Sequence, residues 1–132
     1  MSNREHHFGY WEVLQREIGF SQAVRVGNTI YMAGCAPLKA DFTPVHVGDF
    51  NGQIQFVYER INETLKHFGL AFGDIVREVM YVTDIDALMK ANPIRKSFYG
   101  SGPYPASTAV EVKRLVLPEI MVEIEITAAL PV

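Results

Sequence analysis

One amphipathic stretch of the sequence limits the fold more than any other feature. Its apolar side chains recur at steps of three and four residues, which places them on one face of a helix. They are Phe50, Ile54, Val57, Ile61, Leu65 and Phe68. Asp49 is suited to cap the start of this helix, and Gly69 is suited to end it. We therefore expect a helix over residues 50–68 whose apolar face covers a sheet.

The segments around this helix predict β-strands and one more helix. Gly27-Asn28 lies between two β-rich runs and indicates a hairpin turn, because both residues tolerate positive φ. Residues 34–48 contain two glycines and two prolines and predict a loop. The expected strands cover residues 23–26, 29–33, 75–82, 108–116 and 121–129, and the second helix lies between residues 84 and 99.

Two segments allow alternatives. Residues 10–17 fit either an edge strand or a loose N-terminal arm. Pro93, in the second helix, has no backbone N–H to donate to the preceding turn. We expect either a kink at Pro93 or a new helix start with Asn92 as its cap.

The element order β-β-α-β-α-β-β predicts an α/β (α+β) domain, a mixed sheet with two helices on one face. Strand-helix-strand crossovers favour parallel pairing, and the terminal hairpins favour antiparallel pairing. The second face of the sheet would meet water or another subunit, and the apolar content of the chain favours another subunit. Side chains of the last strand alternate between the faces: Val122, Ile124 and Ile126 on one, Glu123, Glu125 and Thr127 on the other.

Length, composition and charge narrow the class of protein. The 132 residues fit a single domain over residues 1–132, with residues 1–18 as an N-terminal extension or edge strand. Hydrophobic residues make up 48% of the chain and charged residues 20%, as in ordinary globular proteins. No apolar run predicts a membrane span or a secretory signal, so we expect a cytoplasmic location. The net charge of −3, with scattered Lys and Arg, does not favour nucleic-acid binding.

Cysteine and histidine usage gives no sign of a metal site. Cys35 is the single cysteine, which excludes an internal disulfide and a cysteine-based metal cluster. The four histidines show no metal-ligand spacing beyond the His6-His7 doublet, and adjacent side chains rarely converge on one ion.

Several stretches, in the same order and at nearly the same spacing, resemble the RidA/YjgF family over roughly residues 19–129. One stretch departs from the family pattern: where the family has Pro-Ala-Arg-Ser/Thr, this chain has Ser107 in the arginine position. The matching stretches are Gly19-Phe20-Ser21-Gln22-Ala23-Val24, Gly27 to Gly34, Gln53, Asn62, Leu65 and Gly69, Gly73-Asp74-Ile75-Val76, Asp84, Asn92 to Tyr99, Pro105 to Val112, and Glu123-Ile124-Glu125.

The resemblance implies a chorismate-mutase-like protomer in a homotrimer whose sheets pack into a central barrel-like core. Small-molecule ligands would bind in clefts between subunits. The best-known activity of the family is the hydrolysis of reactive enamines and imines to a keto acid and ammonia, with no metal or organic cofactor. Some members carry an older label of endoribonuclease, which the acidic balance of this chain does not favour.

Ser107 changes what the resemblance implies about substrates. The family arginine holds the substrate carboxylate, and a guanidinium does so with two charge-assisted hydrogen bonds. A serine offers only one neutral hydrogen bond. Replacing the arginine with serine should therefore cost on the order of 2–4 kcal/mol in transition-state binding. Lys113 would lie too far along the strand to take over, and Arg25 is a weaker alternative.

The resemblance also implies roles for other residues. Glu123 matches a glutamate that positions the hydrolytic water, although a strand glutamate paired with a neighbouring Lys or Arg fits the sequence equally well. For Cys35 and Tyr104 the simpler interpretations are an inert buried thiol and a packing contact, and for Asn92 a helix cap. The residues expected to contact substrate are Ser107, Phe20, Cys35, Tyr104, Ala109 and Asn92.

The leading hypothesis is a trimer that binds a small metabolite in its clefts and acts as a cofactor-free deaminase on an imine or enamine without a free α-carboxylate. A non-catalytic module that senses or sequesters a ligand is the alternative. Endoribonuclease activity is a distant third hypothesis.

Overall fold

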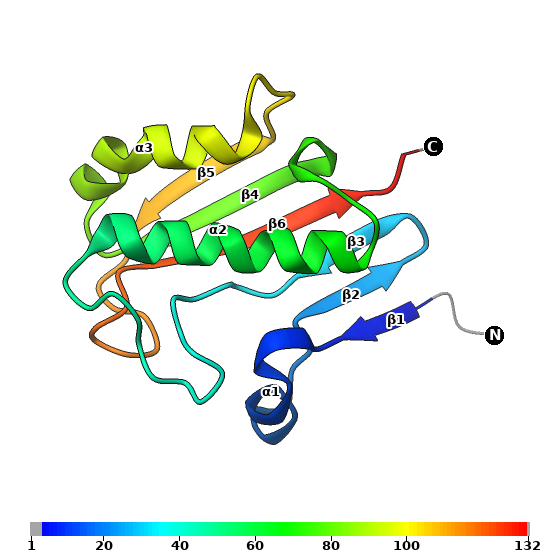
Figure 1. Cartoon of the computed structure of the whole chain (residues 1–132), viewed down its shortest axis with the longest axis horizontal. Helices are drawn as coiled ribbons and strands as arrows, with labels where there is room; N and C mark the ends of the chain where they lie inside the picture. The colour runs from blue at the N-terminus through cyan, green and yellow to red at the C-terminus, as the bar shows by residue number, and fades with distance from the viewer. Residues whose placement is uncertain (1–3, 132) are drawn as a thin grey trace.

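A six-stranded mixed sheet, with strand order β1-β2-β3-β6-β4-β5, forms the centre of the molecule (Figure 1). The computed structural model describes residues 4–131. Its elements are β1 (Arg4–His7), the 3-10 turn η1 (Gly9–Trp11), α1 (Glu12–Ile18), β2 (Ala23–Val26), β3 (Thr29–Met32), α2 (Phe50–His67), the 3-10 turn η2 (Phe72–Asp74), β4 (Ile75–Val82), α3 (Ile85–Tyr99), β5 (Ala106–Glu111) and β6 (Val122–Ala129). The predicted α/β class and mixed sheet are confirmed.

Strand pairing confirms the first hairpin and corrects the last one. β2 and β3 pair in antiparallel fashion around Gly27, which has a φ of 59°. We expected β5 and β6 to form a hairpin, but β4 lies between them, parallel to β5 and antiparallel to β6. The physical reason is burial: every second residue of β6 is buried, whereas all six residues of β5 are exposed. The strand with the buried face takes the centre of the sheet, and the exposed strand takes its edge.

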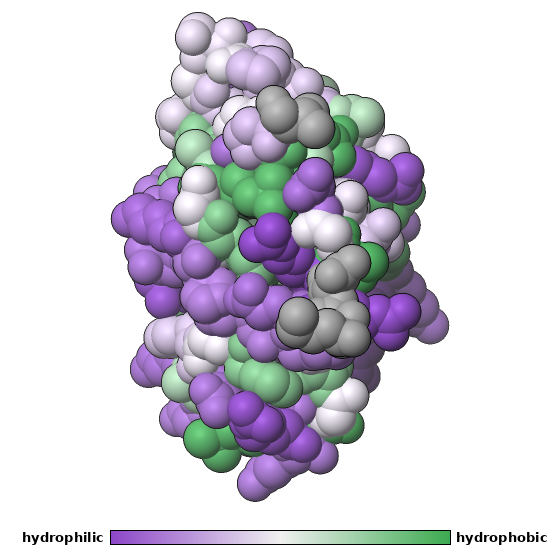
Figure 2. All heavy atoms as spheres, turned by 90° about the vertical axis from the view of Figure 1, so that its right-hand side faces the viewer, coloured by the Kyte–Doolittle hydropathy of each residue, from purple (hydrophilic) through white to green (hydrophobic). Residues whose placement is uncertain are grey.

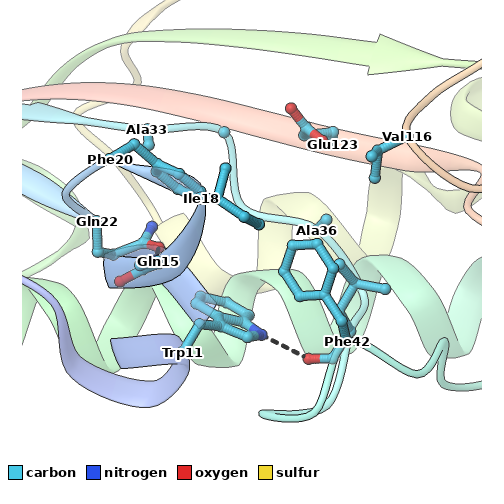
Figure 3. A pocket seen from close by; sticks show the side chains of 12 residues that line it. Trp11, Gln15, Ile18, Phe20, Gln22, Ala33, Ala36, Phe42, Val116 and Glu123 are labelled. Carbon is cyan, nitrogen blue, oxygen red and sulfur yellow. Dashed lines mark hydrogen bonds between the residues drawn. The ribbon is translucent and has the colours of Figure 1, made fainter. Parts of the chain in front are cut away.

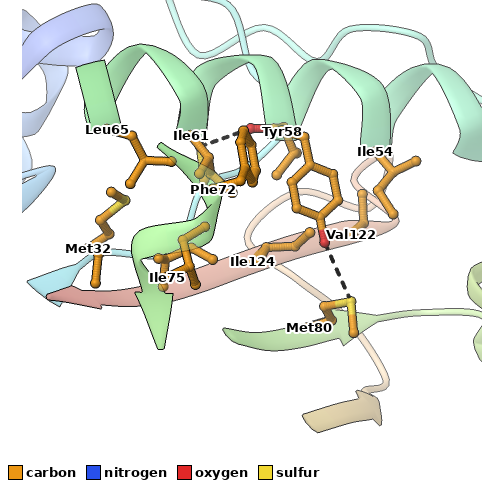
Figure 4. Close-up of a cluster of buried hydrophobic side chains, with 14 of the residues drawn as sticks. Met32, Ile54, Tyr58, Ile61, Leu65, Phe72, Ile75, Met80, Val122 and Ile124 are labelled. Carbon is orange, nitrogen blue, oxygen red and sulfur yellow. Dashed lines mark hydrogen bonds between the residues drawn. The ribbon is translucent and has the colours of Figure 1, made fainter. Parts of the chain in front are cut away.

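Helices α2 and α3 cover one face of this sheet, as expected (Figure 1). α2 begins at the predicted cap, where the Asp49 side chain accepts a hydrogen bond from the Gly52 N–H at 3.0 Å. Its apolar stripe points at the sheet in Figure 4, where Ile61 and Leu65 lie over Ile75 and Ile124. This layer is the hydrophobic core and holds the helix face of β4 and β6 in place.

α3 runs through Pro93 as one helix, so a restart capped by Asn92 is wrong. The cap lies at Asp84, whose side chain accepts from the Ala87 N–H at 3.1 Å. Pro93 removes the hydrogen bond that would reach the carbonyl of Met89. Met89 is exposed, so water can satisfy that carbonyl and the helix continues.

The N-terminal segment also differs from the expectation. Residues 10–17 form the end of η1 and most of α1, not an edge strand; the edge strand is β1, earlier in the chain. An ion pair between Glu12 and Arg16 at 3.0 Å spans one turn of α1, and Gly19, with a φ of 101°, ends it. Trp11 fixes the segment on the body of the protein, because its indole N–H donates to the Leu38 carbonyl at 2.9 Å.

The second face of the sheet is open. Glu123, Glu125 and Thr127 of β6 point to it, away from α2 and α3. The side of the molecule in Figure 2 shows small apolar patches separated by hydrophilic side chains.

None of the helices in the described part of the chain has the length and apolar character that a bilayer span requires.

Candidate active-site cavity and a buried charge network

A cavity of about 320 Å³ opens between the N-terminal segment, the hairpin of β2 and β3, and β6 (Figure 3). We call it the Glu123 cavity. Its volume lies at the lower end of the range for small-molecule sites. The lining residues are Trp11, Gln15, Ile18, Phe20, Gln22, Ala33, Gly34, Ala36, Leu38, Phe42, Val116 and Glu123.

Glu123 is the one ionisable side chain among these residues. It stands on the open face of β6 and is half-buried. Burial, together with the neighbouring charge of Glu125, raises the pKa of the Glu123 carboxyl above its usual range. A carboxyl with a raised pKa can accept and return a proton nearer to neutral pH than an ordinary glutamate.

Gly34 makes room for this carboxylate. A Cβ at position 34 would overlap the Glu123 side chain, so any larger residue would displace the carboxylate. The backbone around Gly34 is itself fixed, because Cys35 exchanges hydrogen bonds with Ile124 of β6 at 2.8 and 3.1 Å. The absence of a side chain at Gly34 therefore allows the carboxylate to occupy this position.

A pair of amides forms the second polar feature. The Gln15 side-chain N–H donates to the side-chain oxygen Oε1 of Gln22 at 2.6 Å, and both residues are buried. Oε1 of Gln15 is buried without a hydrogen-bond partner in the described structure. An unpaired buried acceptor is costly, so this atom can accept from a ligand N–H or from water.

Phe42 reaches the cavity from a strained backbone. Its φ is 69°, a region that bulky side chains rarely occupy. Such strain costs on the order of 1–3 kcal/mol and is concentrated at binding and active sites. The loop after β3 thus keeps an aromatic ring at the cavity wall at the expense of backbone strain.

Ser107 lies elsewhere, in a network around Glu78. The Glu78 side chain is 0% exposed and accepts four hydrogen bonds. Tyr58 and Tyr99 donate to one carboxylate oxygen at 2.9 and 2.8 Å. Arg95 and Ser107 donate to the other at 2.5 and 3.0 Å. These five residues form the Glu78 network, which joins α2, α3, β4 and β5.

The charges in this network stabilise one another. Burial acts to lower the pKa of the Arg95 guanidinium, but the Glu78 carboxylate acts in the opposite direction and the net shift is upward. Burial, reinforced by the Glu78 charge, raises the pKa of the Tyr58 and Tyr99 hydroxyls, so both remain protonated donors. The positive charge of Arg95 is therefore neutralised within the protein.

A cation does share a carboxylate oxygen with Ser107, but it is Arg95, which the sequence did not point to. Arg25 instead donates to the Gly27 carbonyl at 2.8 Å, on a strand separated from β5 by three others. A sequence signal for the network did exist. Glu78 alternates with Met80 and Val82, so it had to point to the helix face, where a buried acid requires partners.

The other predicted contact residues are dispersed. Phe20 lines the cavity with Glu123. Asn92 accepts a long hydrogen bond of 3.4 Å from Arg95, and Tyr104 donates to the Gly100 carbonyl at 3.0 Å. Ala109 is exposed on β5, on the same face as Ser107. Sequence reasoning did not find Trp11, Gln15 or Ile18, because it assigned no helix to their segment.

Cys35 is 2% exposed, in the core beneath α2, with its thiol directed at the Val57 carbonyl. Burial raises the pKa of this thiol strongly, so the thiolate needed for nucleophilic chemistry does not form.

Within one chain, Ser107 and Glu123 face away from each other. Ser107 aligns with Glu78, which aligns in turn with Ile126 on the helix face of the sheet. Glu123 lies an odd number of residues from Ile126 and so points to the open face. A site that contains both residues would need two chains.

The chain is similar in sequence to known proteins. The family model described as endoribonuclease L-PSP matches residues 13–130. A RutC family protein of Pyrococcus abyssi is 32% identical over 120 residues, which cover 90% of this chain and 93% of the relative. A 2-iminobutanoate/2-iminopropanoate deaminase of Dermatophagoides farinae is 27% identical over 73% of this chain and 74% of its own length.

Solved structures agree in fold. A YjgF-family protein of Mycobacterium tuberculosis superposes with a TM-score of 0.81 at 28% identity, covering 96% of this chain and 99% of the other. The protein YjgH superposes with a TM-score of 0.85 at 27% identity, covering 98% of both chains.

Proposed function

The chain belongs to the RidA/YjgF family, whose model carries the description endoribonuclease L-PSP, and on that premise we propose that it binds a small imine or enamine without a free carboxylate and hydrolyses it. The observation that carries the proposal is the half-buried Glu123 with its raised pKa in a cavity whose lining includes no Lys, Arg or His among the described residues. Such a site favours a neutral or cationic nitrogen and repels an anion.

The chemistry requires one acid-base group and one water. In the first step the water oxygen bonds to the imine carbon, one water proton passes to Glu123, and the same carboxyl returns a proton to the imine nitrogen. In the second step the carbinolamine C–N bond breaks and the hydroxyl proton passes by the same route to the leaving nitrogen. The products are a ketone or aldehyde and ammonia, and Glu123 ends as it began. An enamine would first take a proton on carbon to give the imine.

The Glu78 network supports the substrate class. The charge of Arg95 is already paired with Glu78, and Ser107 adds a neutral hydroxyl that donates to the same carboxylate. A substrate carboxylate near Ser107 would meet the Glu78 charge without a free guanidinium to balance it. We therefore expect poor turnover of simple imino acids, including those named for the mite relative.

The assembly is part of the proposal. We infer a homotrimer with the sites between subunits, because the open face of the sheet carries Glu123 and needs a partner to exclude water from it. The opposed directions of Ser107 and Glu123 fit a cleft to which two subunits contribute. Light scattering at several protein concentrations measures the mass: a monomer at all of them would contradict this assembly.

The test of activity uses two imines made in place. An amine oxidase generates imines without a carboxylate, an amino-acid oxidase generates imino acids, and semicarbazide traps whatever the protein has not consumed. We expect the protein to accelerate the loss of the carboxylate-free imine more than the loss of the imino acid. The Glu123→Gln variant should not accelerate the loss of the carboxylate-free imine. Turnover of imino acids equal to that of an arginine-bearing relative would overturn the interpretation that Ser107 disfavours substrates with a carboxylate.

A second candidate is a non-catalytic binding module. It is favoured by the composition of the cavity, in which one carboxyl is the sole ionisable group among the described lining residues. This candidate predicts ligand-dependent thermal stabilisation without turnover across the imine panel. RNA cleavage has no supporting observation in the described structure, and the acidic balance of the chain opposes it.

A further inference from the structure

We infer that the N-terminal segment makes the Glu123 cavity selective for a nitrogen compound with an aromatic or branched aliphatic body. This inference rests on the proposed function only in placing the reacting nitrogen at Glu123. It adds the identity of the rest of the ligand and assigns its recognition to η1 and α1.

The first argument is the chemistry of the walls. Trp11 and Ile18 come from the N-terminal segment, and Phe42 and Val116 come from two loops on the other side of the same cavity (Figure 3). Phe20 completes an apolar enclosure, in which a flat or branched group of a ligand can pack against aromatic and aliphatic surfaces. A short polar metabolite would leave these walls in contact with water.

The second argument is that the enclosure is built and not incidental. Trp11 is held by its bond to the Leu38 carbonyl, and the Arg16 guanidinium lies over the Phe8 ring at 4.0 Å from its centre. Phe42 keeps its ring at the wall despite a left-handed backbone. Ile18 remains 58% exposed at the mouth, where a bound apolar group would cover it.

The third argument is the placement of polar groups. Glu123 supplies the negative charge, and the unpaired oxygen of Gln15 supplies a buried acceptor. Both favour a ligand that donates N–H bonds. A carboxylate or phosphate would find like charge at Glu123 and no compensating cation among the described lining residues.

The experiment uses Trp11, the single tryptophan of the sequence, as a fluorescent reporter inside the cavity. Phenethylamine, ethylamine and phenylacetate are titrated into the full-length protein; none of them is a substrate for hydrolysis. We expect saturable binding of phenethylamine, about 30-fold tighter than ethylamine because a buried phenyl group removes apolar area from water. Phenylacetate, of the same shape but opposite charge, should bind at least ~10-fold more weakly than phenethylamine.

Two variants of α1 provide a matched comparison. Ile18→Ala removes a side chain that lines the cavity, whereas Val13→Ala removes one that is 72% exposed on the same helix and does not line it. We expect Ile18→Ala to weaken phenethylamine several-fold and Val13→Ala to leave it unchanged. Ala33→Leu, which fills the cavity, should abolish binding; thermal unfolding of each variant verifies that it folds.

Equal affinity for the amine and the carboxylate, or equal effects of the two α1 variants, would overturn the inference. Amine binding without imine turnover would leave the inference standing and remove the proposed hydrolysis. Turnover of small imines without selective binding of phenethylamine would do the reverse.

Discussion

Removing the cation from the Glu78 network should destabilise the protein more than any exposed charge change. Arg95→Met leaves the Glu78 carboxylate, 0% exposed, with three neutral hydroxyl donors and no positive charge. Breaking a buried pair from one side costs about 3–5 kcal/mol, and the remaining hydroxyls favour the lower end. For 132 residues, about 3 kcal/mol corresponds to a fall of roughly 10 °C in Tm.

The cost should depend on the charge left behind, which a double-mutant cycle measures. Glu78→Gln keeps the shape and removes the charge, so Arg95→Met in that background should cost about 1 kcal/mol or less. Urea unfolding followed by circular dichroism at pH 7 gives the four free energies, with protomer concentration held fixed because an oligomer unfolds in a concentration-dependent way.

An exposed ion pair supplies the control. Lys66 and Glu63 lie 3.5 Å apart on the surface of α2, and Lys66→Met should change stability by less than about 0.5 kcal/mol. Additive effects of the Glu78 and Arg95 changes, or a cost of Arg95→Met no larger than that of Lys66→Met, would refute the account of the network as a coupled buried pair.

Three further predictions concern the cavity and the core. Glu123→Gln should lower imine hydrolysis by about 10²–10⁴-fold in steady-state assays, and wild-type activity should fall as pH drops through the raised pKa of Glu123, above the range of an ordinary glutamate. Because burial penalises the charged form, the pKa of the Glu123 carboxyl is higher in the folded than in the unfolded protein. Glu123→Gln should therefore be more stable than wild type at neutral pH, and this difference in stability should vanish in acid. Gly34→Ala should lower activity by displacing the carboxylate while leaving Tm within a few degrees, and a Tm collapse would contradict this separation. Cys35 should react with a thiol reagent only as fast as the protein unfolds, and rapid labelling of the native protein would contradict the burial of this thiol.

Periodicity predicted the fold where one face of an element decides its environment. The apolar stripe of α2 and the alternation in β6 specify which side is buried, so both were located closely from the sequence. Strand order was harder, because the sequence of β5 does not reveal that β4 would pair between it and β6. Long-range pairing is decided by total burial in the sheet, which local patterns do not contain.

The candidate site was predictable in part for a similar reason. Glu123 and Phe20 could be placed from the matched motifs, and the structure brings both to one cavity. The contribution of α1 was missed because Tyr10 to Glu17 mixes aromatic and charged residues without a clear period. Its helix depends on the tertiary contact of Trp11 with the loop after β3, and such a contact overrides local propensity.

The saturation of Glu78 also constrains how such a sequence can change over time. Its two carboxylate oxygens already receive four donors, and the donor from β5 is the small hydroxyl of Ser107. An arginine at position 107 would bring a second guanidinium to the same carboxylate, where it would compete with Arg95 instead of remaining free for a ligand. We therefore expect a single exchange toward the family arginine to be unproductive unless position 78 or 95 changes as well.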